Sequence, residues 1–212
     1  MKISKIIFPL MMVTTMTSCI AGEPPKAIDY DTFIAAAQEE EAKESPYTKA
    51  TLKYSLRDGS PSTVPPKKGE IAFTLGEEYW VTDSEDEYAD LGMEVINGKA
   101  TLMDDLVTAL SEDMEDIEAR VTNPKSVKKK AGYFQTSSSL SLDAELAITG
   151  GKLTNDDGEF DLQRLGLAYV ISWMNYGLVK SYLISEYYIT KQNGEVVEDF
   201  DYEISCSVTY QK

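Results

Sequence analysis

The hydrophobic pattern of the chain contains segments with helical spacing and segments with strand spacing. Apolar residues recur every three or four positions in residues 30–43, 103–121 and 161–175, which predicts three amphipathic helices. The clearest apolar stripe consists of Leu106, Leu110, Met114, Ile117 and Val121. The other two stripes consist of Phe33, Ile34 and Ala37, and of Leu162, Leu165, Val170, Ile171 and Met174. Each stripe predicts a helix face that packs against a core.

Capping residues support the predicted ends of these helices. Asp29 or Asp31 can cap the first helix, and Pro46 follows it. Asp161 is placed to cap the third helix, and Gly177 occupies the position just after its predicted end. We therefore expect the helices to begin and end close to these residues.

Alternating apolar and polar residues predict strands in further segments. These are residues 51–57, 70–75, 78–82, 140–148, 178–190 and 200–210. Asn193-Gly194 is a turn signal between the last two, and Asn97-Gly98 marks a turn within residues 93–102. Strands and helices do not alternate regularly. The pattern therefore predicts an α+β fold, with a curved antiparallel sheet of about six or seven strands packed against about three helices.

Composition excludes several classes of activity. The chain has 212 residues, 36 acidic and 20 basic side chains, a net charge of −16 and no histidine. Without histidine, Ser-His-Asp triads, Cys-His pairs and histidine metal sites cannot form. The acidic balance disfavours nucleic acid as a partner, because phosphate binding needs clustered Lys and Arg. The sequence has no phosphate loop, Ser-x-x-Lys or Gly-x-Ser-x-Gly motif, so we expect no cofactor and no catalysis.

The first residues have the pattern of a secretory signal. Lys2 and Lys5 precede an apolar stretch at residues 6–13, which is too short to span a bilayer. This stretch leads to Met16-Thr17-Ser18-Cys19, which resembles a bacterial lipobox. The resemblance implies cleavage before Cys19 and attachment of lipid to its sulfur, and buried acyl methylenes then anchor the protein. A plain secretory signal with an incidental cysteine is the alternative.

These features divide the chain into three parts. Residues 1–18 are predicted to be the signal peptide, residues 19–28 the lipidated N-terminus and tether, and residues 29–212 a single domain. The protein is then expected at a bacterial cell membrane or outer membrane, facing outside the cytoplasm. The second cysteine, Cys206, lies in an alternating strand pattern and is interpreted as a core residue.

The order of the predicted elements resembles that of the LolA/LppX-like lipoproteins. The segments that carry the resemblance are residues 47–54, Tyr176-Gly177-Leu178-Val179 and Val208-Thr209-Tyr210. The resemblance implies a half-barrel-like sheet that cradles acyl chains. A shared fold by itself does not establish a shared function.

Three charged clusters are candidates for binding. Asp156-Asp157 lies in an Asp-Gly turn that lacks the end carboxylates of an EF-hand loop, although a looser Ca²⁺ site stays open. The acidic helix face at residues 113–118 is interpreted as a solvated surface, with cations or basic partners as the alternative. The lysine cluster Lys125, Lys128, Lys129 and Lys130 is interpreted as complementing the helix C-terminus, with contact to anionic lipid headgroups as the alternative.

Two aromatic pairs, Tyr79-Trp80 and Tyr187-Tyr188, lie on predicted strands, so the members of each pair face opposite sides. Core packing is the simpler interpretation, and stacking on a sugar or lining an apolar pocket is the alternative.

Together these features predict a membrane-anchored extracytoplasmic lipoprotein with a non-catalytic binding domain. The first candidate ligand is a lipid or another apolar molecule held between the sheet and the helices. The alternative is a cell-surface interaction or adhesion module that binds protein or glycan on an exposed face. A hydrolase that uses two carboxylates is a third and weaker hypothesis.

Overall fold

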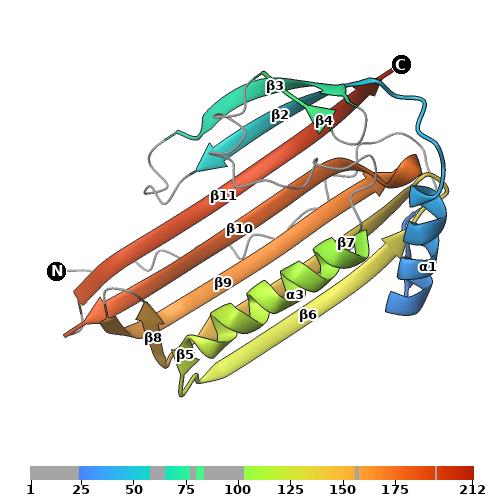
Figure 1. Cartoon of the computed structure of the whole chain (residues 1–212). Helices are drawn as coiled ribbons and strands as arrows, with labels where there is room; N and C mark the ends of the chain where they lie inside the picture. The colour runs from blue at the N-terminus through green and yellow to red at the C-terminus, as the bar shows by residue number, and fades with distance from the viewer. Residues whose placement is uncertain (1–23, 58–64, 77–79, 84–102, 156–157, 194) are drawn as a thin grey trace.

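A computed structural model describes residues 24–57, 65–76, 80–83, 103–155, 158–193 and 195–212. The strands are β1 (Lys26–Ile28), β2 (Lys49–Arg57), β3 (Lys67–Leu75), β4 (Trp80–Val81), β5 (Val121–Thr122), β6 (Ser126–Gln135), β7 (Ser139–Thr149), β8 (Lys152–Asn155), β9 (Gly158–Met174), β10 (Leu178–Gln192) and β11 (Glu195–Gln211). The helices are α1 (Tyr30–Glu41) and α3 (Met103–Ala119), and a 3-10 turn covers Asn175–Gly177. The fold is α+β with the sheet dominant (Figure 1).

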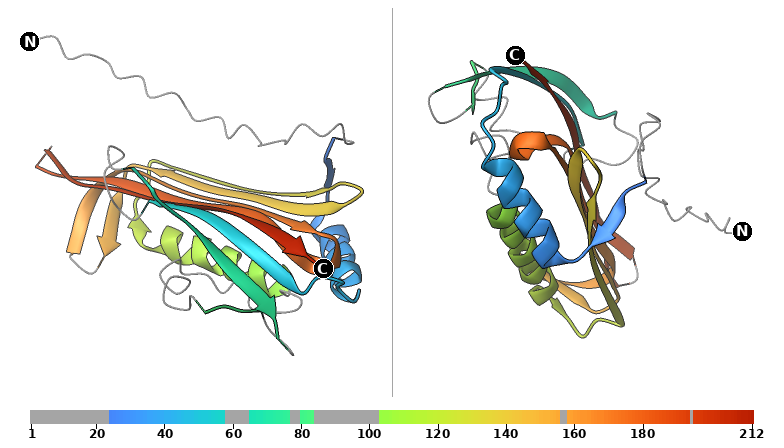
Figure 2. Two further views of the ribbon diagram at one scale, coloured as in Figure 1. Left: turned by 90° about the horizontal axis from the view of Figure 1, so that it is seen from above. Right: turned by 90° about the vertical axis from the view of Figure 1, so that its right-hand side faces the viewer.

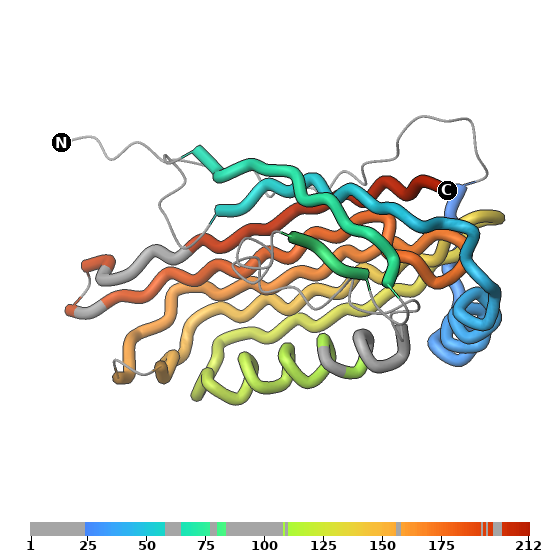
Figure 3. Tube along the Cα trace, turned by 45° about the horizontal axis from the view of Figure 1, so that its top comes forward, coloured from blue at the N-terminus to red at the C-terminus, as the bar shows by residue number. Residues whose placement is uncertain are grey.

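The described strands form one antiparallel sheet of eleven strands. Its main path runs β1-β6-β7-β9-β10-β11-β2-β3-β4, and β8 pairs with both β9 and β5. Within the described residues β1 and β4 lie at opposite ends of this path, so the sheet is open. The β8–β9 and β10–β11 hairpins extend toward the same end of the sheet (Figure 3).

Both helices lie on the same side of the sheet (Figure 2), and we call this side the inner face. The inner face carries the core, including Leu146, Leu167, Ile171 and Trp173, which are at most 2% exposed. The side chains between them point to the opposite, outer face, as strand geometry requires. One face is therefore packed and the other faces solvent, as is common for antiparallel sheets.

Helix α1 confirms the first predicted helix. Asp29 caps it, because the Asp29 Oδ1 atom accepts a hydrogen bond of 2.8 Å from the Thr32 N–H. Phe33 and Ala37 are buried, and the Phe33 ring lies 5.9 Å from the Trp173 ring, centroid to centroid. The predicted stripe thus fixes the helix to one end of the sheet.

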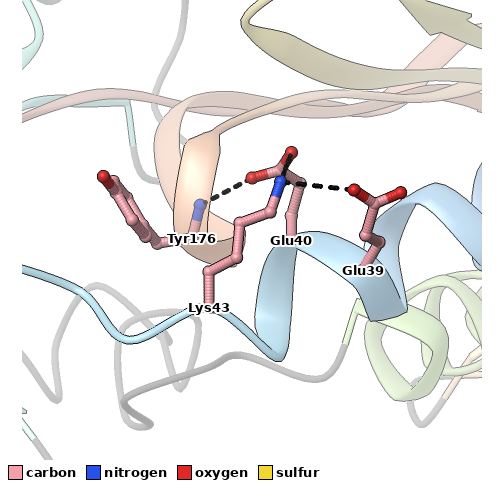
Figure 4. Close-up of polar contacts among 4 residues, drawn as sticks. All are labelled: Glu39, Glu40, Lys43 and Tyr176. Atoms are coloured by element: carbon pink, nitrogen blue, oxygen red, sulfur yellow. Dashed lines mark hydrogen bonds and ion pairs between the residues drawn. The ribbon is translucent and has the colours of Figure 1, made fainter.

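The C-terminal end of α1 is joined to the β9–β10 turn by a polar contact (Figure 4). The Glu40 Oε2 atom accepts a 3.0 Å hydrogen bond from the Tyr176 N–H, and Lys43 Nζ lies 2.6 Å from Glu40 Oε1 and 3.6 Å from Glu39 Oε1. Partial burial acts to raise the pKa of Glu40, but these hydrogen bonds outweigh it and hold the pKa below its ordinary value. Gly177 in this turn has a φ of +66°, which favours glycine.

Helix α3 confirms the second predicted helix. Leu110, Met114 and Ile117 are buried against the inner face, as the stripe predicted. The helix lies over the part of the sheet formed by β6, β7 and β9 (Figure 1). None of the helices in the described part of the chain is long and apolar enough to cross a membrane.

The third predicted helix, residues 161–175, is wrong, because this segment belongs to strand β9. Leu167, Tyr169, Ile171 and Trp173 are all buried and alternate with less buried residues. Two members of the expected helical stripe, Val170 and Met174, instead lie among the less buried positions. The segment forms a strand because β9 pairs with both β7 and β10, so that its backbone N–H and C=O groups are hydrogen-bonded on both sides.

The predicted strand number is also too low. Residues 126–135 contain three consecutive lysines and no clear alternation, so the sequence pattern predicts no strand there, yet they form β6. Residues 26–28 belong to the predicted tether, yet they form β1 and pair with β6. The Asn97-Gly98 turn prediction lies outside the described residues.

Candidate functional site

A groove lies between the C-terminal half of α3 and the first half of β6. Its volume is about 370 Å³, which is within the usual range for ligand sites. The floor is apolar and includes Val121, Val127 and Ile148, while Glu115 and Glu118 of α3 form one wall. The remaining lining residues are Ala119 and Pro124. Val127 is 38% exposed, so part of this apolar floor is open to solvent.

A smaller depression of about 40 Å³ continues the same seam toward the other end of α3. Its lining residues are Leu110, Ser111, Met114, Lys129, Lys130, Ala131, Tyr133, Leu142 and Ala144. We call the two hollows together the α3–β6 groove, and their lining includes β6 residues from Val127 to Tyr133. Figure 3 shows α3 running along this side of the sheet.

One edge of β6 is open along the groove. Strand β7 pairs with β6 over its whole length, from Ser126 to Gln135. On the other edge β1 pairs only with Tyr133, Phe134 and Gln135. In the described part of the chain no strand pairs with the edge from Ser126 to Gly132, which we call the open edge of β6. Such an edge presents backbone N–H and C=O groups that can accept another strand.

Three members of the lysine cluster, Lys128, Lys129 and Lys130, lie on β6, and Lys125 directly precedes this strand. The Lys129 Nζ atom lies 3.7 Å from Glu115 Oε1, about one turn before the C-terminal end of α3. The Lys130 Nζ atom lies 3.5 Å from Asp143 Oδ2 of β7, on the outer face. The side chains therefore alternate between the two faces of the sheet, and lysines at a strand edge are a common device against unwanted pairing.

A second polar cluster joins α3 to the inner face. The Tyr169 hydroxyl of β9 donates a hydrogen bond to Asp113 Oδ2 of α3. Burial raises the pKa of Tyr169, and the hydrogen bond to the Asp113 carboxylate raises it further. Burial likewise raises the pKa of Glu186 on β10, Arg120 opposes this shift, and Asp113 adds to it.

This cluster explains one part of the acidic helix face. Asp113 belongs to the helix face that the sequence predicts to be solvated. It is exposed as a residue, yet its carboxylate accepts the hydrogen bond from Tyr169. Glu118 is half-buried in the groove wall, whereas Glu115 and Asp116 are exposed. The described residues contain no group of three or more potential metal ligands. The hydrogen bond between Tyr169 and Asp113 links α3 to the sheet.

The aromatic pair on β10 divides between the two faces, as predicted. Tyr187 is 37% exposed on the outer face, and Tyr188 is half-buried and packs against the core. The Arg164 guanidinium lies 5.5 Å from the Tyr187 ring centroid, within the range of a cation–π contact. In the other pair Trp80 is 5% exposed, which supports core packing, and Tyr79 lies outside the described residues.

The structure describes one of the two cysteines, Cys206. Cys206 is 6% exposed, and burial raises the pKa of its thiol to about 12 although the Tyr182 hydroxyl opposes the shift. Its interpretation as a core residue is confirmed. Cys19 lies outside the described residues, as do Asp156 and Asp157, so the lipidation and calcium hypotheses stay predictions.

The groove itself was not predicted from the sequence. Val127 and Ala131 lie on either side of three consecutive lysines, Lys128, Lys129 and Lys130, so this stretch lacks the strict alternation that indicates a strand with one apolar side. Comparison of the chain with family models, with curated proteins and with solved structures gave no match in any of the three.

Proposed function

We propose that this protein is a lipid-anchored extracytoplasmic binding module, without catalytic activity, that holds a polypeptide partner in the α3–β6 groove. The observation that carries the proposal is the partly exposed apolar floor around Val127, which lies beside the open edge of β6. A polypeptide can use both features, because its backbone can pair with the strand and its side chains can enter the groove. Cys19 carries the proposed anchor.

A polypeptide suits this groove better than an acyl chain does. Glu115 and Glu118 stand in the wall, and burying a carboxylate against an acyl chain is costly. An acyl chain would also leave the backbone groups of the open edge without hydrogen bonds. The half-barrel cradle implied by the LolA/LppX-like resemblance has less support, because Leu146, Leu167 and Ile171 already pack the inner face.

Site-specific photo-crosslinking in intact cells tests the occupant. A photoreactive amino acid replaces Val127 in the groove, and a matched control replaces Lys53, an exposed residue of the outer face on β2. We expect a discrete polypeptide adduct at position 127 and none at position 53. An adduct with lipid at position 127 would overturn the choice of polypeptide, and the absence of any adduct there would overturn the groove as the site.

A separate experiment tests the anchor. The wild-type protein is expected to incorporate labelled palmitate and to fractionate with membranes, because a diacylated cysteine buries many methylenes. The Cys19→Ala variant should lose both properties, while Cys206→Ala should keep them, since Cys206 is buried in the sheet. Palmitate labelling that survives in Cys19→Ala would contradict the proposed anchor.

A further inference from the structure

The open edge of β6 is already used for pairing at one end. Strand β1 adds to it in antiparallel register, with Lys26 opposite Gln135 and Ile28 opposite Tyr133. The chain then leaves the sheet at Asp29, which caps α1. The open edge of β6, from Ser126 to Gly132, is therefore continuous with the three residues of the same edge that pair with β1.

The two faces of this edge differ in chemistry. Val127 and Ala131 point toward the groove, and Lys129 between them is held by Glu115. Lys128 and Lys130 point to the outer face. A strand that adds to this edge has side chains that alternate in the same way, because successive residues of a strand face opposite sides.

We propose that the partner is an extended segment that adds as a further strand to β6 at Ser126–Gly132 and carries acidic residues in alternation with apolar ones. Its acidic side chains would lie beside Lys128 and Lys130 on the outer face, and its apolar side chains would enter the groove above Val127. This inference rests on the proposed function, which it deepens by naming the chemistry of the partner and its mode of binding.

Charge favours an acidic partner over a second copy of the chain. If β6 of one molecule paired with β6 of another, the lysine-rich edges would face one another, and like charges opposite each other destabilise a sheet. The same lysines that repel a second copy of β6 would attract an acidic segment. The edge therefore discriminates between the two partners by charge.

Fluorescence polarisation with labelled synthetic peptides tests the inference on the full-length protein in lipid nanodiscs. The probe is a seven-residue peptide in which aspartate and glutamate alternate with valine, and its control has lysine at every acidic position. We expect the acidic peptide to bind and the lysine peptide not to bind. The double variant Lys128→Glu/Lys130→Glu should weaken binding by about tenfold or more, since it removes two exposed ion pairs and introduces repulsion.

A matched variant controls for total charge. Lys53→Glu/Lys68→Glu makes the same charge change on the outer face of β2 and β3, away from the groove. Binding to this variant should stay within about twofold of the wild type, because separated exposed charges are screened at physiological salt. If both double variants lose affinity equally, the acidic peptide binds only by general attraction and the inference is wrong.

Backbone methylation separates strand addition from other modes of binding. In an added strand the N–H groups of alternate residues point toward β6, so N-methylation of that set should abolish binding. Methylation of the other set should leave the affinity within about twofold of that of the unmethylated peptide, because those N–H groups point away from β6. Equal binding of both methylated peptides would overturn strand addition.

The outcomes distinguish this inference from the proposed function. If both methylated peptides bind equally and still inhibit formation of the cellular adduct at position 127, the strand-addition inference fails while the groove remains the binding site. If position 127 gives no adduct with cellular polypeptide or peptide, both proposals fail. A dimer that dissociates in Lys128→Glu/Lys130→Glu, measured by analytical ultracentrifugation, would show that a second copy occupies the edge and would overturn the acidic partner.

Discussion

Gly69 of β3 lies directly opposite Tyr54 of β2, and the Tyr54 ring covers the place where a side chain on Gly69 would lie. A Cβ atom on Gly69 would lie 2.5 Å from Tyr54 Cζ and 2.6 Å from Tyr54 Cε1, closer than real Cβ contacts. Tyr54 is 4% exposed, so its ring cannot move into solvent without leaving the core. Gly69→Ala therefore forces a rearrangement of packed side chains.

We expect Gly69→Ala to lower the free energy of unfolding by about 1–3 kcal/mol, the usual cost of overpacking. In a domain of this size each kcal/mol lowers the melting temperature by about 2–4 °C. Urea unfolding followed by tryptophan fluorescence measures the change directly, and thermal unfolding by circular dichroism provides an independent value.

Gly132→Ala on β6 is the matched control. A Cβ atom there would lie 3.0 Å from Cε2 of Phe134, a half-buried residue near the edge of the sheet, so a small ring movement suffices. Alanine also reduces the freedom of the unfolded chain, which stabilises by about 0.4–1 kcal/mol where the backbone permits it. We expect this variant to be as stable as the wild type or more so. If Gly132→Ala is the more damaging change, or if Gly69→Ala has no effect, the reasoning is refuted.

Three further predictions concern the contacts of the helices and the inner face. Phe33→Ala should lower the free energy of unfolding by about 3–5 kcal/mol, because it leaves a cavity at a fully buried site between α1 and the sheet. Loss of protection of the α1 amides in hydrogen exchange would locate the effect. Tyr169→Phe should lower the free energy of unfolding by about 0.5–1.5 kcal/mol, because it removes the hydrogen bond to Asp113. An unchanged midpoint of urea unfolding would show that this hydrogen bond does not contribute to stability. Glu186→Gln should raise the melting temperature at neutral pH. Burial raises the pKa of Glu186, so its contribution to stability is greatest when the group is protonated and falls as the pH rises above its ordinary value of 4.5. The gain in Glu186→Gln should therefore vanish in acid, and a gain that does not depend on pH would contradict the assignment.

Several elements could be predicted from the sequence because their signals are local. The stripes of α1 and α3, the Asp29 cap and the alternation of β2 each depend on residues within a few turns or one strand length. Burial of Cys206 followed from the same kind of pattern on β11. In these places propensity, capping and hydrophobic period all favour the same structure, so local reasoning was sufficient.

Two assignments depended on neighbours that the sequence does not reveal. Residues 161–175 contain apolar residues that fit both a helix and a strand, and the choice was made by pairing of β9 with β7 and β10. Residues 126–135 appear polar because their lysines belong to a strand with one open edge, where charged side chains can reach water. Short-range patterns cannot distinguish these cases, because strand pairing joins residues far apart in the chain.

The sequence by itself therefore determined the acidic and histidine-free chemistry of the chain and the elements with a clear local period, and the leader that ends before Cys19 stays a prediction. Only the tertiary structure decided which strand edge stays open and where α3 lies beside it. The groove beside Val127 exists because α3 packs on the sheet next to β6 without covering the apolar floor there. Such a surface is set by the relative positions of packed elements, and no single segment of the chain carries that information.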